Sequence, residues 1–491
     1  MRRSALVLGV FLAGCGGSVR PALIARTPAV AETPAPIASG VATTSTIATE
    51  PVPEPATSEE HSSRSTETWI GASAESTMVL AGVDETVIGV WVDAPSAREH
   101  VRPPVDVALV VDTSGSMGGD KISNARRAAA SVIQNLRDGD IVSLDAFSDD
   151  ASVLSRPVVL GTGTRRELLR AVSRLQADGS TNLFAGLSLG ESQVAMSPAT
   201  HLVRRVVLIS DGMANIGPST PEALGVVAER GLRFQTQVTC LGVGVDYDER
   251  TLNALAVRSS GRLYHLGDPS KMASILRREM DLLGATVAGD AFVEVVPAPG
   301  VELLPVAGGR TEWGTKGALR IPLGSLFGGQ HREALVRARF KARTFIDSPR
   351  PLASVRLHYR DPAEGDLERV QEVIARVQAT EDGAAVRASM SSRTRSIIAI
   401  QDAAKLEMHA AENVNSGNFD DADRALAAAE SKLSAEAAMV SDATEQRRLS
   451  HAASTVAAAR TSTRASMAAP PAQVRNNALE LNSAGMSGMG Y

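Results

Sequence analysis

The stretch VDVALVVDTSGSM (residues 105–117) decides the fold of this 491-residue chain. Its first part is a nearly continuous apolar run, as in strands that are buried on both faces of a parallel sheet. The run ends at Asp112, and Ser114 and Ser116 follow at alternate positions, with Gly115 between them to relax the turn. Ligands of open α/β sheets bind beyond the carboxyl ends of the strands. We therefore predict a buried strand whose end presents hard oxygen donors.

Strand-like and helix-like segments alternate from residue 103 to residue 283. Continuous apolar strands between amphipathic helices indicate a mostly parallel sheet that is covered on both faces, which is a doubly wound α/β domain. The expected strands are VDVALVVD, IVSLDAFS, RRVVLISD and TQVTCLGVGV, and the expected helices lie at 121–136, 165–175, 221–230, from about 249, and near 270–283.

Two later segments supply further oxygen donors at the same edge of the predicted sheet. Thr181 lies in a loop just before a predicted helix, and Asp211 stands at the end of the strand RRVVLISD. Carboxylate and hydroxyl oxygens suit Mg²⁺, Mn²⁺ or Ca²⁺ better than soft metals. The competing interpretation is that these residues cap the helices that follow, because Ser, Thr and Asp are favoured there.

The order Asp-x-Ser-x-Ser, then Thr, then Asp-Gly resembles the von Willebrand factor A family with its metal-ion-dependent adhesion site. The resemblance covers roughly residues 103–283 and includes GVGVDYDERTLNALAVRSSGRLYHL (242–266). It implies a Rossmann-like sheet with one antiparallel edge strand, which we assign to IVSLDAFS (141–148). The metal-binding residues that it implies are Asp112, Ser114, Ser116, Thr181 and Asp211.

The same resemblance implies a function in protein binding. In this family the metal ion takes its last ligand from an acidic side chain of a partner, so we expect a metal-dependent adhesion or assembly protein with an unidentified Asp- or Glu-bearing partner. Mg²⁺ is the expected ion, with Mn²⁺ or Ca²⁺ as alternatives. The alternative function is a scaffold whose C-terminal helices are the interaction surface and whose α/β domain is structural. We expect no enzymatic activity, since the sequence lacks a Gly-x-Ser-x-Gly elbow, a His-Glu-x-x-His motif and a Walker loop.

The N-terminal segment MRRSALVLGVFLAGC (1–15) has the pattern of an export signal. Two arginines precede an apolar run that is shorter than the ~20 residues needed to span a bilayer. LAGC resembles a bacterial lipobox, which implies lipidation of Cys15 and a membrane-anchored lipoprotein of the cell envelope. Gly16 in place of an aspartate favours the outer membrane over the inner one. The alternative is an ordinary export signal with a chance cysteine.

The segment after the predicted signal differs in composition from the rest of the chain. Residues 16–66 are rich in Pro, Ala, Thr and Ser, which predicts a disordered linker with a typical reach of ~40 Å. The whole chain has a net charge of −5 without a basic stripe. This pattern argues against nucleic acid as a partner.

The remaining regions carry no chemistry that the sequence identifies. Residues 67–102 and 284–365 show short alternating strands, and we expect them to form one β-sandwich-like region that the α/β domain interrupts. Residues 366–465 are Ala-rich and predict helices, with a hairpin turn at 415–418. Residues 466–491 are predicted to be a disordered tail.

Two expectations concern single acidic residues. In DYDE (246–249) we favour Asp248 as the cap of a following helix over a second cation site. At the strand end, we expect Asp112→Ala to weaken metal and partner binding together while the fold survives, because a strand end is normally exposed. Loss of its repulsion with Asp211 is further expected to raise the stability of the metal-free protein.

Overall fold

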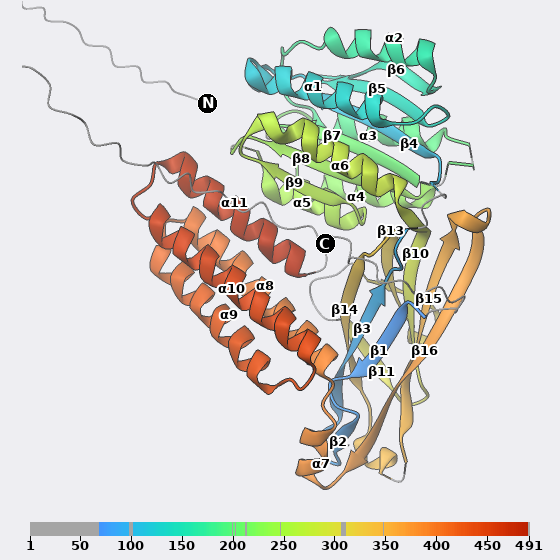
Figure 1. Cartoon of the computed structure of the whole chain (residues 1–491), viewed down its shortest axis with the longest axis vertical. Helices are drawn as coiled ribbons and strands as arrows, with labels where there is room; N and C mark the ends of the chain where they lie inside the picture. The colour runs from blue at the N-terminus through green and yellow to red at the C-terminus, as the bar shows by residue number, and fades with distance from the viewer. Residues whose placement is uncertain are drawn as a thin grey trace, which may run out of the picture. The chain divides into compact units, whose positions relative to one another are not determined.

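The computed structural model describes residues 68–97, 102–198, 200–201, 203–211, 214–245, 247–305, 311–346 and 348–489. The predicted signal peptide, the predicted linker and Cys15 lie outside these residues. The described chain forms an α/β domain, a β-sandwich and a helical region (Figure 1).

The α/β domain is built on a six-stranded sheet in the order β6-β5-β4-β7-β8-β9. Every neighbouring pair is parallel except β5 and β6. All residues of β4, β7 and β8 are buried, as the apolar runs predicted. The predicted doubly wound class is therefore confirmed. The strands are β4 (Val105–Asp112), β5 (Ile141–Phe147), β6 (Ala151–Val159), β7 (Val203–Ser210), β8 (Thr236–Val243) and β9 (Arg262–Leu266).

The antiparallel edge strand is β6, and our assignment of this role to IVSLDAFS is wrong. That segment forms β5, which runs parallel to β4 and pairs with β6 on its other side. We overlooked β6 because its residues are mostly exposed or half-buried and do not form a continuous apolar run. It also contains Pro157, a residue that edge strands tolerate because one side of the strand needs no hydrogen bonds.

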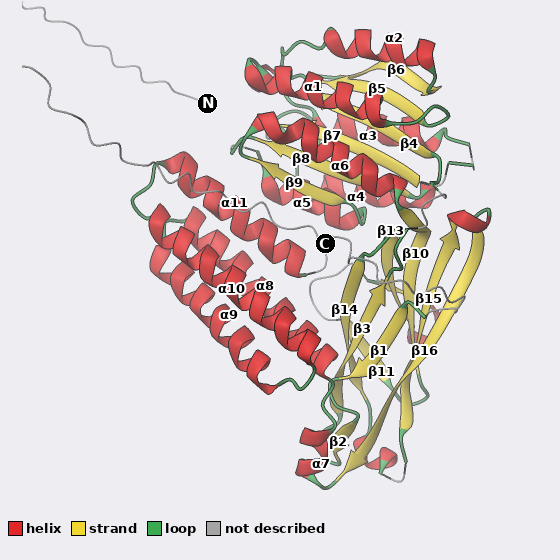
Figure 2. Cartoon of the chain, in the orientation of Figure 1, coloured by secondary structure: helices red, strands yellow, loops and turns green. Residues whose placement is uncertain are grey.

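Six helices cover the two faces of this sheet (Figure 2). One face carries α1 (Asp120–Asn135), α2 (Thr162–Ser173) and α6 (Met272–Gly284), which share an apolar cluster with the odd-numbered residues of β4. The other face carries α3 (Leu183–Ala195), α4 (Pro221–Gly231) and α5 (Glu249–Arg258), which pack against its even-numbered residues. Burial of both faces explains why strands this apolar are stable here.

The β-sandwich combines strands from both sides of the α/β domain. One sheet has the order β1-β3-β14-β11 and the other β12-β13-β10-β15-β16-β2. The expected pairing across the insertion is present, since β3 runs antiparallel to β14. The strands are β1 (Ile70–Ala74), β2 (Met78–Leu80), β3 (Glu85–Asp93), β10 (Thr286–Pro297), β11 (Glu302–Pro305), β12 (Glu312–Trp313), β13 (Leu319–Phe327), β14 (His331–Arg339), β15 (Arg350–Asp361) and β16 (Leu367–Thr380).

Strand β16 corrects the predicted start of the helical region at residue 366. LERVQEVIARVQAT contains many residues with good helix propensity, and that propensity led us to expect a helix. In the structure residues 367–377 pair antiparallel with β15 and residues 378–380 pair parallel with β2, and the burial of the segment alternates along much of the strand. Pairing with a long neighbouring strand therefore overrides the local preference.

The helical region contains α7 (Gly383–Ala388), α8 (Ser392–Asn415), α9 (Phe419–Met439), α10 (Ala443–Ser466) and α11 (Pro471–Gly488). Helices α8 and α9 are joined at residues 416–418, where we predicted the hairpin turn. None of the described helices is both long enough and apolar enough to cross a membrane.

Helix α11 corrects the prediction that residues 466–491 are a disordered tail. Pro471 occupies the start of the helix, where its missing N–H costs nothing. The helix buries Ala478 and Leu481 among the other C-terminal helices, and Leu479 in the apolar cluster of the α/β domain. Its few apolar residues are thus enough to order it, because they face partners on two sides.

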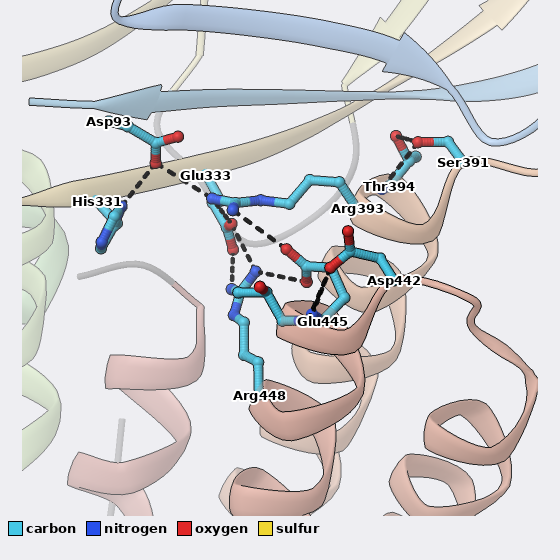
Figure 3. Close-up of polar contacts among 10 residues, drawn as sticks. Asp93, His331, Glu333, Ser391, Arg393, Thr394, Asp442, Glu445 and Arg448 are labelled. Carbon is cyan, nitrogen blue, oxygen red and sulfur yellow. Dashed lines mark hydrogen bonds and ion pairs between the residues drawn. The ribbon is translucent and has the colours of Figure 1, made fainter.

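Charged side chains join the helical region to the β-sandwich (Figure 3). Arg393 of α8 lies 3.0 Å from Glu333 of β14 and 3.1 Å from Glu445 of α10. Arg448 of α10 pairs with the same Glu333, and Arg393 also reaches Asp93 of β3 at 3.2 Å. We call the ion pairs around Glu333 the ionic joint. Beside them, the Thr394 hydroxyl of α8 donates to the carbonyl of Ser73 of β1 at 3.0 Å.

Candidate metal centre

The site lies where the strand order of the α/β sheet reverses. From β4 the chain continues outward to β5 and β6, and from the adjacent β7 it continues to β8 and β9 on the other side. In open α/β sheets ligands bind at such a point, beyond the carboxyl ends of the strands, and we call the region between the ends of β4 and β7 the crevice. Asp112 is the last residue of β4, and Asp211 directly follows β7.

Asp112 is the most buried donor of the predicted set, with 0% of its surface exposed. Its Oδ1 accepts a hydrogen bond from the backbone N–H of Ser114 at 2.8 Å, and its Oδ2 accepts one from the Ser210 hydroxyl at 2.5 Å. Burial raises the pKa of the Asp112 carboxyl; the hydrogen bonds from Ser114 and Ser210 partly oppose this rise, and the nearby charge of Asp211 adds to it.

A continuous series of hydroxyl contacts connects the two strand ends. The Oγ atoms of Ser114 and Ser116 are 3.1 Å apart, and the Ser116 hydroxyl donates to Oδ1 of Asp211 at 2.8 Å. Ser114 is buried, whereas Ser116 is exposed at the rim. Four of the predicted residues therefore converge on one small region that is open to solvent on one side.

Thr181 is placed by backbone contacts between its loop and the loop after β4. The N–H of Gly115 donates to the carbonyl of Gly179 at 2.9 Å, and the N–H of Asp178 donates to the carbonyl of Thr113 at 2.7 Å. Thr181 itself is buried, and its N–H donates to the side chain of Asn215 at 2.8 Å. The loop that carries the fifth predicted donor is thus fastened beside the loop that carries both serines.

Sequence reasoning missed two residues of the site, Ser210 and Lys121. Ser210 holds Asp112, and Nζ of Lys121 forms an ion pair with Oδ2 of Asp211. Lys121 is the second residue of α1. A cation in the first turn is disfavoured by the helix dipole, and this unfavourable position is the sequence signal that identifies a lysine with a tertiary partner.

The chemistry of the donors fits a hard divalent cation. The set offers two carboxylates and three hydroxyls, and one cationic side chain balances the carboxylates only in part. Within the described residues, no group of three or more His, Cys, Asp or Glu side chains is placed to hold a metal ion. Any metal bound at this crevice would therefore rely on serine and threonine oxygens beside Asp112 and Asp211, which are ligands that suit Mg²⁺ and Mn²⁺.

Asp248 behaves as the helix cap that we predicted. Its Oδ1 accepts from the backbone N–H groups of Arg250 and Thr251 at 3.1 and 3.4 Å, at the start of α5. Asp246 lies outside the described residues.

Comparisons with known proteins agree with the fold of the α/β domain. Residues 106–278 match the von Willebrand factor type A domain family. An uncharacterized protein of Synechocystis is 28% identical over 295 residues, which cover 57% of this chain and 67% of that protein. Inter-alpha-trypsin inhibitor heavy chain H3 of Rattus norvegicus is 29% identical over 176 residues, but these cover 34% of this chain and only 20% of that protein.

A solved structure shares more than the α/β domain. The von Willebrand factor type A protein from Catenulispora acidiphila superposes with a TM-score of 0.67 at 18% identity and covers 87% of this chain and 98% of its own. Its likeness shows a common fold that extends well beyond residues 106–278. Residues 106–278 form a von Willebrand factor type A domain, because they match that family and fold into its sheet with two helical layers.

Proposed function

We propose that this protein binds an acidic side chain of a partner protein through a divalent cation held at the crevice between β4 and β7. The observation that carries the proposal is the hydrogen-bonded series from Asp112 through Ser114 and Ser116 to Asp211, in which the Ser116 hydroxyl is exposed to solvent. Thr181 completes the proposed set from the neighbouring loop.

The donor set supports partner binding because its five side chains are one fewer than the six ligands of an octahedral cation, and three of the five are neutral hydroxyls. Mg²⁺ prefers octahedral oxygen coordination, and a site with few carboxylates retains affinity for a further anionic ligand. Partner binding and metal occupancy are then coupled, since each completes the surroundings of the other. Mg²⁺ is the proposed ion, with Mn²⁺ or Ca²⁺ as alternatives, and no enzymatic activity is proposed.

The proposal includes a location in the bacterial cell envelope, with a lipid anchor at Cys15 and the outer membrane as the favoured membrane. Its support is the export-signal pattern and the LAGC sequence of residues 12–15. Metabolic labelling with a fatty-acid probe tests it: the wild-type chain is expected to incorporate the label, and Cys15→Ser is not. Equal labelling of both chains would contradict lipidation at Cys15.

Calorimetric titration of Mg²⁺ and Mn²⁺ into the full chain tests the metal site. We expect binding by the wild type and a loss of at least about tenfold in affinity for Asp211→Asn, which removes one of two carboxylates. Asp248→Asn is the matched control, because this carboxylate caps α5 through hydrogen bonds that do not involve the crevice. Absence of binding by the wild type would refute the proposed function.

A partner pull-down with and without a chelator then separates the two candidate functions. Capture that requires metal and fails with Asp211→Asn supports the proposal. If capture is unaffected by the chelator and by Asp211→Asn, the result favours the alternative function, a scaffold whose helical region is the interaction surface. Deletion of residues 366–491 is unsuitable for this test, because it removes β16 from the sandwich and Leu479 from the apolar cluster of the α/β domain. Charge-reversal variants at exposed positions of α9 test the scaffold function instead of this deletion.

A further inference from the structure

We propose that Lys121 is a tethered internal cation that competes with the divalent metal for Asp211. This inference rests on the proposed function and concerns how strongly that site binds its ion. The observation behind it is the ion pair between Nζ of Lys121 and Oδ2 of Asp211, one of the proposed metal ligands.

The lysine reaches the carboxylate from the surface of the domain. Its side chain is 27% exposed, whereas that of Asp211 is 0% exposed. The stem passes Gly244 at the end of β8, where an added Cβ would lie 3.5 Å from Cε and 3.7 Å from Nζ of Lys121. Gly244 has a φ of 86° and donates its N–H to Leu266, so the wall beside the lysine is fixed backbone. The ammonium group is therefore guided to the crevice while its outer side remains open to solvent.

Both oxygens of Asp211 are engaged by this chain's own side chains. Oδ1 accepts from Ser116 and Oδ2 is paired with Lys121. A divalent cation close to Asp211 would repel the ammonium group strongly, because the Asp211 carboxylate is buried and water screens charges poorly beside it. The flexible four-carbon stem of lysine allows the ammonium to withdraw into solvent. Metal binding then includes the loss of the Lys121–Asp211 pair, and the apparent affinity is lower by the free energy of that pair.

The pair also has a role when metal is absent. Asp112 and Asp211 are both buried. Lys121 forms an ion pair with Asp211. A buried carboxylate without a cation is costly to the folded state. Lys121 therefore stabilises the metal-free domain and weakens metal binding through the same contact.

The test compares Lys121→Gln with the wild type in the full chain, with Mn²⁺ alone as the probe. We expect Lys121→Gln to bind Mn²⁺ about three- to tenfold more tightly, and to melt at a lower temperature without metal. Saturating Mn²⁺ is expected to raise its melting temperature by more than that of the wild type. Arg127→Gln is the matched control, since it removes an exposed cation from the same helix and contacts Asn124 instead of the crevice.

A second variant predicts a change in the opposite direction. Lys121→Arg keeps the charge and offers two parallel hydrogen bonds to a carboxylate, so it is expected to compete better and to weaken Mn²⁺ binding. Unchanged or weaker Mn²⁺ binding by Lys121→Gln would overturn the competition, as would tighter binding by Lys121→Arg. Failure of the proposed function is a separate result, because it appears as absence of Mn²⁺ binding by the wild type itself.

Discussion

Asp112 shows that a residue's position in the sequence does not by itself set the consequence of replacing it. From the sequence we expected an exposed strand end, where alanine would leave the fold intact and relieve repulsion with Asp211. The structure places Asp112 at 0% exposure with hydrogen bonds from Ser114 and Ser210. Lys121 already balances Asp211. The expected gain in stability therefore has little physical basis.

We now predict that Asp112→Ala destabilises the metal-free protein by about 1–3 kcal/mol, because it removes the two buried hydrogen bonds that Asp112 accepts from Ser114 and Ser210. Asp112→Asn keeps an acceptor oxygen for one of these two donors and is expected to cost less. Chemical denaturation of both variants measures the difference. Equal or greater stability of the alanine variant would contradict the role assigned to these hydrogen bonds.

Asp145 is a buried carboxyl on β5 outside the crevice, and it predicts a dependence of stability on pH. Burial raises its pKa to about 7, and a hydrogen bond from Ser143 opposes this only in part. A raised folded-state pKa means that the folded state holds the proton more tightly than the unfolded state. The stabilisation is then complete below about pH 4 and is lost as pH rises through about 7.

We therefore predict that Asp145→Asn raises the free energy of unfolding by about 2–4 kcal/mol at pH 8 and changes it little at pH 4. Thermal melts of the wild type and the variant across this pH range measure the effect. Asp150→Asn, at an exposed position after β5, is the control and is expected to show no such trend. A gain that is as large at pH 4 as at pH 8 would exclude the carboxyl as its cause.

At the scale of elements, helix α11 depends on close approach to α8. A Cβ added to Gly485 would lie 2.5 Å from Cγ of Met408 and 2.8 Å from the backbone carbonyl of Ala404. The backbone contact cannot be relieved by rotating a side chain, so the two helices are in contact at this glycine. The same closeness allows α11 to reach the α/β domain, where Asn476 lies 2.8 Å from His265.

We predict that Gly485→Leu separates α11 from α8 at a cost of about 1–3 kcal/mol, as expected for overpacking. Hydrogen–deuterium exchange is expected to show faster exchange over residues 471–488, while β4 and β7 stay protected. Ser487→Leu adds the same side chain at an exposed position of the helix and serves as the control. Unchanged protection of α11 in the Gly485 variant would mean that the contact is not needed to dock it.

At the scale of the whole molecule, the C-terminal helices are held by contacts of two kinds. Toward the α/β domain they offer Leu479, which is buried in that domain's apolar cluster, and Arg475, which lies 3.4 Å from Glu249. Toward the sandwich they offer the ionic joint around Glu333. Apolar contacts persist in salt, whereas ionic contacts with partial exposure weaken as salt screens them. The Leu479 contact is therefore expected to persist in salt, whereas the Glu333 ion pairs and the Arg475–Glu249 pair weaken.

We predict that Arg448→Met destabilises the full chain by about 1–2 kcal/mol at low salt, because Glu333 and Glu445 then share Arg393 alone. The difference from the wild type is expected to shrink in high salt. Arg424→Met is the matched control. The Arg424 side chain is 77% exposed, and its ion pair with Asp421 on α9 is expected to contribute at most about 0.5 kcal/mol. Equal effects of both variants would refute an energetic role for the joint.

The sequence by itself determined the features that depend on local pattern. Continuous apolar runs require burial on both faces, so β4, β7 and β8 and the doubly wound class could be predicted. The converging residues Asp112, Ser114, Ser116 and Asp211 were predictable for a related reason, because parallel strands end at one edge and bring their last residues together. Whether these oxygens bind a metal remains a prediction.

Only the tertiary structure decided the features that depend on a distant partner. Strand β16 has helix-forming residues, but β15 lies beside it, and α11 is polar apart from the few side chains that two other parts of the chain bury. The position of Lys121 in the first turn of α1 indicates a tertiary partner, but only the fold shows that this partner is Asp211, 90 residues away. In each case the free energy comes from a contact that no local pattern records, because burial and ion pairing need both partners in place.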